Sequence, residues 1–230
     1  LGIPAQARRI VFLVEVPEEK SREAQEVIHS AFVEKMDDYV TAVDEKNVIL
    51  VHTLEADEEY ADMEQIARLL LDVMTTEVLV SSRVSYGTVV KELREISKSY
   101  KEAKMGLDVG SIFYEQRDII AYDSLGIGRL IYQLPVNLCH MFIQEIFGDD
   151  IPEELDEETL MTVNKFYDNN LNVSETARQL YVHRNTLVYR IEKLKAATGL
   201  DIRTFDDALT LKIALMVVNY TKYLDEEMPD

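Results

Sequence analysis

The sequence predicts an α+β domain followed by an all-α helix-turn-helix domain. Three observations support this prediction: β-branched runs alternate with amphipathic helices as far as about residue 130, helical patterns alone follow, and the sign of the charge reverses locally between residues 159 and 203. We place the two domains at 1–130 and 131–230. A length of 230 residues suits two small domains, and a hydrophobic fraction of 47% is sufficient for packed cores.

The elements expected in the first domain follow the order β-α-β-β-α-β-α-β. The apolar run 10–16 is typical of a buried strand, and 20–36 has apolar residues at helical spacing. The β-branched runs 39–43 and 48–53 flank a polar turn, which predicts a hairpin. The remaining elements are helices near 58–74 and 88–106 and strands near 78–85 and 119–122. This order predicts a sandwich with the helices on one side of a mainly antiparallel sheet.

Helices alone are expected beyond about residue 130. Residues 136–147 form an apolar helix that ends at Gly148, and the acidic segment 149–158 follows. We interpret this segment as a solvated linker that continues into the acidic first turn of the next helix, where carboxylates favour the positive end of the helix dipole. A calcium loop needs alternating acids and a turn glycine, and the segment has neither.

The net charge of −19 argues against a nucleic-acid partner only if the charge is spread evenly. Residues 1–148 carry a net charge of −11 and residues 149–158 one of −7. Residues 159–203, in contrast, contain seven basic and four acidic side chains, a net charge of +3. Because electrostatic recognition is local, a polyanionic partner is expected at this positive segment.

Several protein classes and site types find no support in the sequence. There is no apolar run of about 18 residues and no signal-peptide pattern, and the single Cys139 suits a reducing cytoplasm. No P-loop, dinucleotide fingerprint or nucleophile elbow is present. The neighbours Cys139 and His140 diverge on a helix, and neither His29 nor His52 has a partner at metal-binding spacing. We therefore expect no cofactor, no metal and no membrane span.

The pattern of helix signals near the C-terminus predicts a helix-turn-helix at about 159–203. A lead helix is expected over 159–169. Asn172 then caps a short helix over 173–180, and Glu175, three residues later, completes a capping-box pattern. In this motif the second helix enters the major groove of DNA.

That second helix is expected over 183–198, closed by Gly199. At about 100° per residue, Leu187, Ile191 and Leu194 form one inward stripe. Polar and basic side chains lie on the outward face, on the flank and in the first turn, and Asn and Arg at such places can pair with adenine and guanine. The candidate DNA-binding residues, including those placed to hold phosphates, are Ser174, Arg178, His183, Arg184, Asn185, Thr186, Tyr189, Arg190 and Lys193.

Each of these residues has a simpler interpretation. Exposed Arg, Asn and Lys side chains on a helix are commonly just solvated. Tyr189 can pack at the rim of the core, and His183 can cap the helix. The last helix, 205–223, is apolar on nearly every side, so it must be buried within the helical domain or against a second subunit. A homodimer is expected because helix-turn-helix proteins usually read two half-sites.

The motif sequence closely resembles the C-terminal helix-turn-helix of the PucR/CdaR family of bacterial transcriptional regulators. The resemblance lies in NVSETARQL at 172–180 and VHRNTLVYRI at 182–191, with support from TGLD at 198–201 and LTLKIAL at 209–215. It implies a sequence-specific regulator of a catabolic pathway that binds double-stranded DNA. It also implies a small-molecule effector sensed by an N-terminal domain that is missing here, because the sequence starts with Leu1 and suggests a piece of a longer protein.

The segment 9–135 resembles the GGDEF-like domain that often precedes this motif, through SYKEA at 99–103 and YDSLG at 122–126. This resemblance implies a GGDEF-like, ferredoxin-like sandwich. Diguanylate cyclases carry a glycine pair on the central hairpin, whereas this hairpin has DEKN at 44–47, and Glu15 is the one acid at the end of the preceding strand. We therefore expect a non-catalytic domain. The alternatives are a nucleotide-binding or diguanylate-cyclase-like signalling protein and a protein-interaction module.

Overall fold

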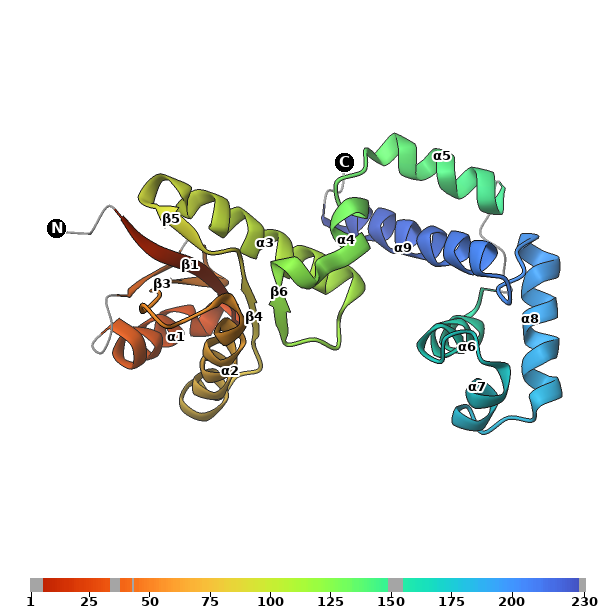
Figure 1. Ribbon diagram of the computed structural model, residues 1–230, viewed down its shortest axis with the longest axis horizontal. Helices are drawn as coiled ribbons and strands as arrows, with labels where there is room; N and C mark the ends of the chain where they lie inside the picture. Colours follow the sequence, from red (N-terminus) through yellow and green to blue (C-terminus); the bar gives the residue numbers. More distant parts are fainter. Residues whose placement is uncertain (1–5, 34–37, 43, 149–154, 228–230) are drawn as a thin grey trace. The chain divides into compact units, whose positions relative to one another are not determined.

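The chain divides into two compact units, Leu1–Tyr132 and Gln133–Asp230, which are described separately (Figure 1). The computed structural model describes residues 6–33, 38–42, 44–148 and 155–227. Most of the acidic segment, 149–154, lies outside the described residues. Within the described part, no helix is long and apolar enough to cross a membrane.

A single mixed sheet forms the centre of the first unit. Its strands in the described residues are β1 (Gln6–Glu15), β2 (Tyr39–Ala42), β3 (Asn47–Thr53), β4 (Arg83–Tyr86), β5 (Val90–Glu92) and β6 (Ile119–Ala121). The order is β2-β3-β1-β4-β6, and β5 also pairs with β1. The pairs formed by β1, and the β2–β3 pair, are antiparallel, and β4–β6 is parallel. The predicted hairpin and the mainly antiparallel sheet are confirmed.

The α-helices that accompany the sheet in the described residues are α1 (Ser21–Ile28), α2 (Met63–Val73), α3 (Ile96–Phe113) and α4 (Gly126–Ile131). Several boundaries differ from the prediction, and for two of them the structure shows the reason. The helix expected from residue 88 begins at Ile96, because Val90 is in β5 and pairs with Arg9 of β1. The strand expected from residue 78 begins at Arg83, because a π-helical turn, Met74–Val78, extends α2.

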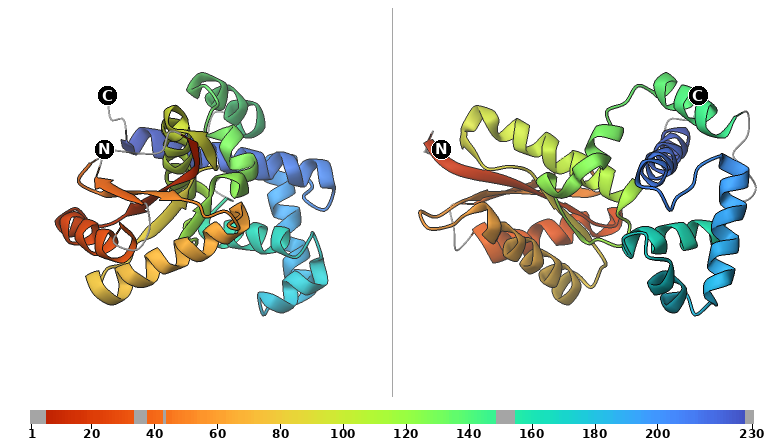
Figure 2. Two further views of the ribbon diagram at one scale, coloured as in Figure 1. Left: turned by 60° about the vertical axis from the view of Figure 1, so that its left-hand side comes forward. Right: turned by 45° about the vertical axis from the view of Figure 1, so that its right-hand side comes forward.

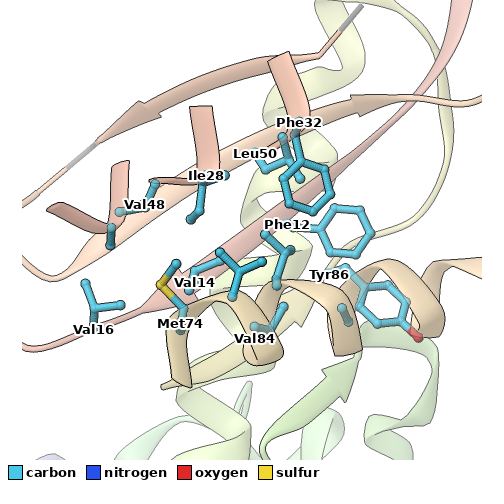
Figure 3. Packing of buried hydrophobic residues seen from close by; sticks show 14 of the residues in the cluster. Phe12, Val14, Val16, Ile28, Phe32, Val48, Leu50, Met74, Val84 and Tyr86 are labelled. Atoms are coloured by element: carbon cyan, nitrogen blue, oxygen red, sulfur yellow. The ribbon is translucent and has the colours of Figure 1, made fainter. Parts of the chain in front are cut away.

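The helices cover both faces of the sheet, so the prediction that they lie on one side was wrong (Figures 1 and 2). Phe12 and Val14 of β1 pack with α1 and α2, as Figure 3 shows for the residues drawn there. Val11 and Leu13 point the other way and pack with Ala103 and the rest of α3. The unbroken apolar run of β1 is the sequence signal for this arrangement, because a strand covered on both faces has no polar alternation.

The helix α3 approaches the sheet closely along a line of small residues. The Ser85 hydroxyl donates to the Ala103 carbonyl oxygen at 2.7 Å, and the Val11 amide donates to the Ser99 hydroxyl at 3.0 Å. A Cβ atom at Gly106 would lie 2.1 Å from Ser85 Oγ. The absence of a side chain at Gly106 therefore leaves room for Ser85 and its bond to Ala103.

We expect Gly106→Leu to lower the free energy of unfolding by about 1–3 kcal/mol, because the added side chain overpacks the contact between α3 and β4. Leu is the better helix former, so a loss of stability must come from the contact. Urea denaturation followed by circular dichroism measures the change. Lys104→Leu, at an exposed position of the same helix, is the control and should shift stability by less than about 0.5 kcal/mol. Equal midpoints for the two variants would contradict this account.

A buried polar cluster surrounds His52 of β3, whose side chain is 0% exposed. His52 Nδ1 lies 2.8 Å from Asp38 Oδ2, and Nε2 lies 3.2 Å from Glu58 Oε2. Burial opposes protonation of the imidazole, but Asp38 first and Glu58 second outweigh it, so the pKa of His52 is raised above its usual value. No ligand partner of His52 was indicated by its position in the sequence, whereas the fold brings the carboxylates of Asp38 and Glu58 to its ring.

The His52 cluster predicts a loss of stability at rising pH. Protonated His52 contributes stability that is complete below its unfolded pKa of about 6.5 and is lost as pH rises through the higher folded pKa. We expect the urea midpoint of the chain to fall above pH about 6.5, and His52→Asn to flatten that fall. The exposed His29→Asn is the matched control and should keep the wild-type slope. If the urea midpoints of wild type and His52→Asn fell in parallel with rising pH, protonated His52 would not be the source of the loss.

The described part of the second unit is helical, with α5 (Val136–Phe147), α6 (Glu157–Asp168), α7 (Val173–Gln179), α8 (Arg184–Thr198) and α9 (Phe205–Glu227). The helices α6 to α9 share one core, and α5 packs along α9. Ala208 and Leu211 of α9 are 4% and 0% exposed within that core, so the last helix buries apolar surface inside its own unit. The predicted acidic helix start is confirmed, since the Asp156 side chain accepts from the Thr159 amide at 2.8 Å.

Candidate nucleic-acid interface

The helix α7 begins at the predicted cap. The Asn172 side chain accepts from the Glu175 amide at 3.1 Å. The Glu175 carboxylate does not point back to the cap as the capping-box pattern suggested: it accepts from Arg178 Nε at 3.0 Å and from Gln179 Nε2 at 2.7 Å. These bonds, Arg178 first, lower the pKa of Glu175 to about 2. Arg178 therefore lies on the surface with a carboxylate already bound.

The turn between α7 and α8 is fixed by two backbone bonds. The Val182 amide donates to the Ala177 carbonyl oxygen at 3.0 Å, and the Tyr181 amide donates to the Arg178 carbonyl oxygen at 3.2 Å. This pair of bonds is the Schellman arrangement that closes a helix. Val182 and Ala177 both pack in the core, so the turn sets the direction in which α8 leaves α7.

The helix α8 is anchored by the predicted apolar stripe. Leu187, Ile191 and Leu194 are 0%, 1% and 2% exposed, which confirms their inward orientation. His183 caps the helix through Nδ1, which accepts from the Asn185 amide at 3.2 Å. Of the two interpretations of His183, the structure therefore shows the cap.

The outward face of α8 consists of side chains that the sequence analysis selected. The exposed candidates on α7 and α8 are Ser174, Arg178, Arg184, Asn185, Thr186, Tyr189 and Lys193. Tyr189 is 69% exposed, which does not fit rim packing. The first turns of α8 thus offer amide, hydroxyl, phenol and guanidinium groups to solvent.

Arg190 differs from the other candidates because its side chain is only 23% exposed. Its guanidinium donates to Thr162 Oγ1 at 3.1 Å and forms an ion pair with Glu158. Both partners belong to α6. The sequence placed Arg190 on the flank of this helix, and in the structure its side chain joins α8 to the lead helix.

Two further basic residues of the positive segment are also bound within the unit. Asp201 pairs with Arg203 at 2.6 Å and with Lys195 at 3.1 Å, and Arg203 also pairs with Glu192. The Arg203 contact is the main reason that the pKa of Asp201 lies well below its usual range. Within the described residues, Arg184 and Lys193 are the basic side chains of α8 for which no ion pair forms.

A side chain of the turn itself closes the hairpin of the first unit. The Asp44 carboxylate accepts from the amides of Lys46 and Asn47, both at 2.8 Å, and so closes the turn itself. Its pKa is lowered because these bonds outweigh the opposing effect of burial. Among the described residues, no group of three or more metal-binding side chains occurs.

Comparison with known proteins gives two family matches. Residues 159–217 match the PucR C-terminal helix-turn-helix domain, and residues 1–109 match the GGDEF-like domain. The chain thus carries a GGDEF-like domain followed by a PucR-type helix-turn-helix domain. The helix-turn-helix match includes the exposed face of α8, so the family relationship and the local geometry concern the same surface.

Several curated relatives of the chain are named as regulators. It is 25% identical to the purine catabolism regulatory protein of Bacillus subtilis (strain 168), and the matched region covers 70% of this chain and 32% of that protein. It is 31% identical to the carbohydrate diacid regulator of Escherichia coli (strain K12), with 63% and 36% covered. It is 27% identical to the proline-responsive transcriptional activator PutR of Bacillus subtilis (strain 168), with 76% and 44% covered. The chain therefore spans less than half the length of these relatives.

Sequence reasoning missed the residues that position α8. Glu158 and Thr162 lie 32 and 28 positions before Arg190 along the chain, and nothing in their spacing indicated the contact. Tyr181 was treated only as part of the turn, although it is 97% exposed with φ at 55°. A bulky residue directly after a capped short helix, where glycine is usual, was the available signal.

We expect Arg190→Ala to destabilise the helical unit by about 1 kcal/mol, because the Thr162 hydroxyl loses its partner and α8 loses a contact with α6. Differential scanning calorimetry of the chain measures the shift in melting temperature. The matched control is Arg184→Ala, which removes an exposed guanidinium from the same helix and should leave the melting temperature within error. If both variants melt like wild type, Arg190 does not hold the two helices together.

Proposed function

We propose that the chain is the DNA-binding portion of a transcriptional regulator of a catabolic pathway. The observation that carries this proposal is the exposed first half of α8, in a unit that matches the PucR helix-turn-helix domain. The names of these relatives, which concern purines, carbohydrate diacids and proline, support a catabolic role. Such a protein would work where the chromosome lies, in the bacterial cytoplasm.

The residues divide by the DNA groups that they can reach. Arg184, Asn185 and Thr186 lie in the first turn of α8, the part that enters the major groove in this motif, and we assign them to base edges. Tyr189 and Lys193 follow along the same outward face and extend the contact toward the phosphates. His183 and Arg190 act by positioning α8, through the cap and through α6.

Phosphate contacts are assigned to the first helix of the motif. Ser174 is exposed in the first turn of α7, and the Arg178 side chain is 73% exposed near its end. Arg178 is bound to Glu175, so contact with a phosphate requires the guanidinium to share or exchange its partner. An exposed ion pair of this kind contributes little, so the exchange costs little free energy.

The full regulator would act as a homodimer controlled by a small-molecule effector. Two copies of the helix-turn-helix would read two half-sites about one helical turn of DNA apart. Because the chain spans less than half of its relatives, we assign the sensing of the effector to a part of the regulator outside this sequence. The first unit then serves as a non-catalytic scaffold or relay, in keeping with a hairpin turn closed by Asp44.

Selection from a pool of random duplexes, followed by fluorescence anisotropy, tests the proposal. The wild-type chain should enrich one sequence, and its affinity for that duplex should fall steeply with salt. Arg184→Ala should weaken binding by about 1–3 kcal/mol and relax the preference at one base pair. Lys222→Ala, an exposed charge on α9, is the control for lost charge alone and should bind nearly as wild type.

Failure to enrich any duplex, or an Arg184→Ala variant that binds as tightly as wild type, would contradict the assignment of α8. Formation of a cyclic dinucleotide from GTP and magnesium would instead favour the enzymatic alternative.

A further inference from the structure

Tyr181, in the turn between α7 and α8, combines two unfavourable properties. Its backbone has φ at 55°, in the left-handed region, where a side chain with a Cβ atom is strained. Its side chain is 97% exposed, so a large aromatic surface remains in water. Neither property stabilises the fold, and together they point to a role outside it.

The other helix ends of this unit show what the position requires. Tyr181 occupies the residue of the Schellman turn that glycine usually takes. Gly199 fills the corresponding position after α8 with φ at 76°, and Asn170 fills it after α6 with φ at 50°. Glycine and asparagine tolerate this backbone well, whereas tyrosine does not.

Packing does not explain the choice of tyrosine. Leu171 also has a positive φ, 62°, but its side chain packs against the helical core, which compensates for the strain. In the turn after α7 the core contact comes from Val182, the next residue along. The ring of Tyr181 is left directed into solvent.

The surroundings of Tyr181 indicate what it contacts. It lies two residues before the cap His183, beside the end of α8 that presents Arg184. Arg178, whose carbonyl oxygen accepts from the Tyr181 amide, is exposed on the other side. Tyr181 therefore lies within three residues of two exposed arginines along the chain, and a polyanion bound to this end of α8 would lie near the phenol.

We propose that Tyr181 contacts the sugar-phosphate backbone of bound DNA. The phenol donates a hydrogen bond to a phosphate oxygen, and the ring packs on the deoxyribose. This inference rests on the proposed function, and it adds a residue that sets the register of α8 without reading sequence. The exposed ring and the strained backbone are then explained by the complex rather than by the free protein.

The test uses Tyr181→Gly and Tyr181→Phe in the whole chain. Glycine relieves the backbone strain, so its melting temperature should be no lower than that of wild type. Its affinity should fall roughly ten-fold, and by the same factor, for the enriched duplex and for a scrambled duplex of equal composition. Tyr181→Phe keeps the ring but lacks the hydroxyl, so its affinity for both duplexes should fall by a smaller factor.

The chain provides a matched control for the backbone change. Leu79 also has a positive φ, 60°, and is 79% exposed, but it lies in the first unit at the end of the turn that extends α2. Leu79→Gly removes an exposed side chain from the same backbone conformation, and it should leave both DNA affinities unchanged.

Each other outcome overturns a distinct statement. If wild type binds the enriched duplex and Tyr181→Gly binds it equally well, the contact is absent and the proposed function stands. If Tyr181→Gly melts at a lower temperature, the ring serves the fold. If affinity falls only on the enriched duplex, Tyr181 reads bases rather than the backbone. If wild type binds no duplex, the proposed function fails and this inference fails with it.

Discussion

The burial of one narrow stripe on α8 determines the rest of the helix-turn-helix. Leu187, Ile191 and Leu194 are nearly inaccessible, and they pack with Phe166 of α6 and Ala177 of α7. Once this stripe faces inward, helix geometry leaves no choice about which residues face out. The caps at both ends, His183 and Gly199, fix the length of the helix and the turns around it. The exposed face is therefore a consequence of apolar packing rather than of any contact among its own polar side chains.

The net charge of a segment differs from the charge that is free to meet a partner, because some basic side chains are already bound to carboxylates. The segment 159–203 carries a net charge of +3, but Arg190, Lys195, Arg203 and Arg178 are bound to carboxylates of the same unit. Arg190 joins α8 to α6, and Asp201 binds both Lys195 and Arg203 at the end of α8. The other basic side chains of this segment are Arg184 and Lys193 of α8 and Lys165 of α6. The location of the charge matters more for recognition than its sum.

The sequence predicted those features that depend on near neighbours. The Asn172 cap, the Gly199 end, the inward stripe and the hairpin of β2 and β3 all arise from residues a few positions apart or from strict periodicity. The errors concern contacts between distant segments. Arg190 meets Glu158 across 32 positions, and Val90 joins β1 rather than the helix beside it. The faces of the sheet were misjudged although β1 carries the signal, because helix placement depends on how distant elements pack. Spacing rules hold no information about such contacts.

Buried polar side chains join the helices, strands and loops of the first unit. Ser85 donates to the Ala103 carbonyl oxygen, Ser99 accepts from the Val11 amide, and Glu102 accepts from both the amide and the hydroxyl of Thr88. His52 is held between Asp38 and Glu58 in the same way. In an active site, by contrast, polar groups point toward a space that substrate or metal can occupy. Here each of these groups satisfies a partner in the protein, and in doing so ties a helix, a strand or a loop to its neighbour. This pattern is that of a rigid frame, in which hydrogen bonds hold the helices and loops in place on the sheet.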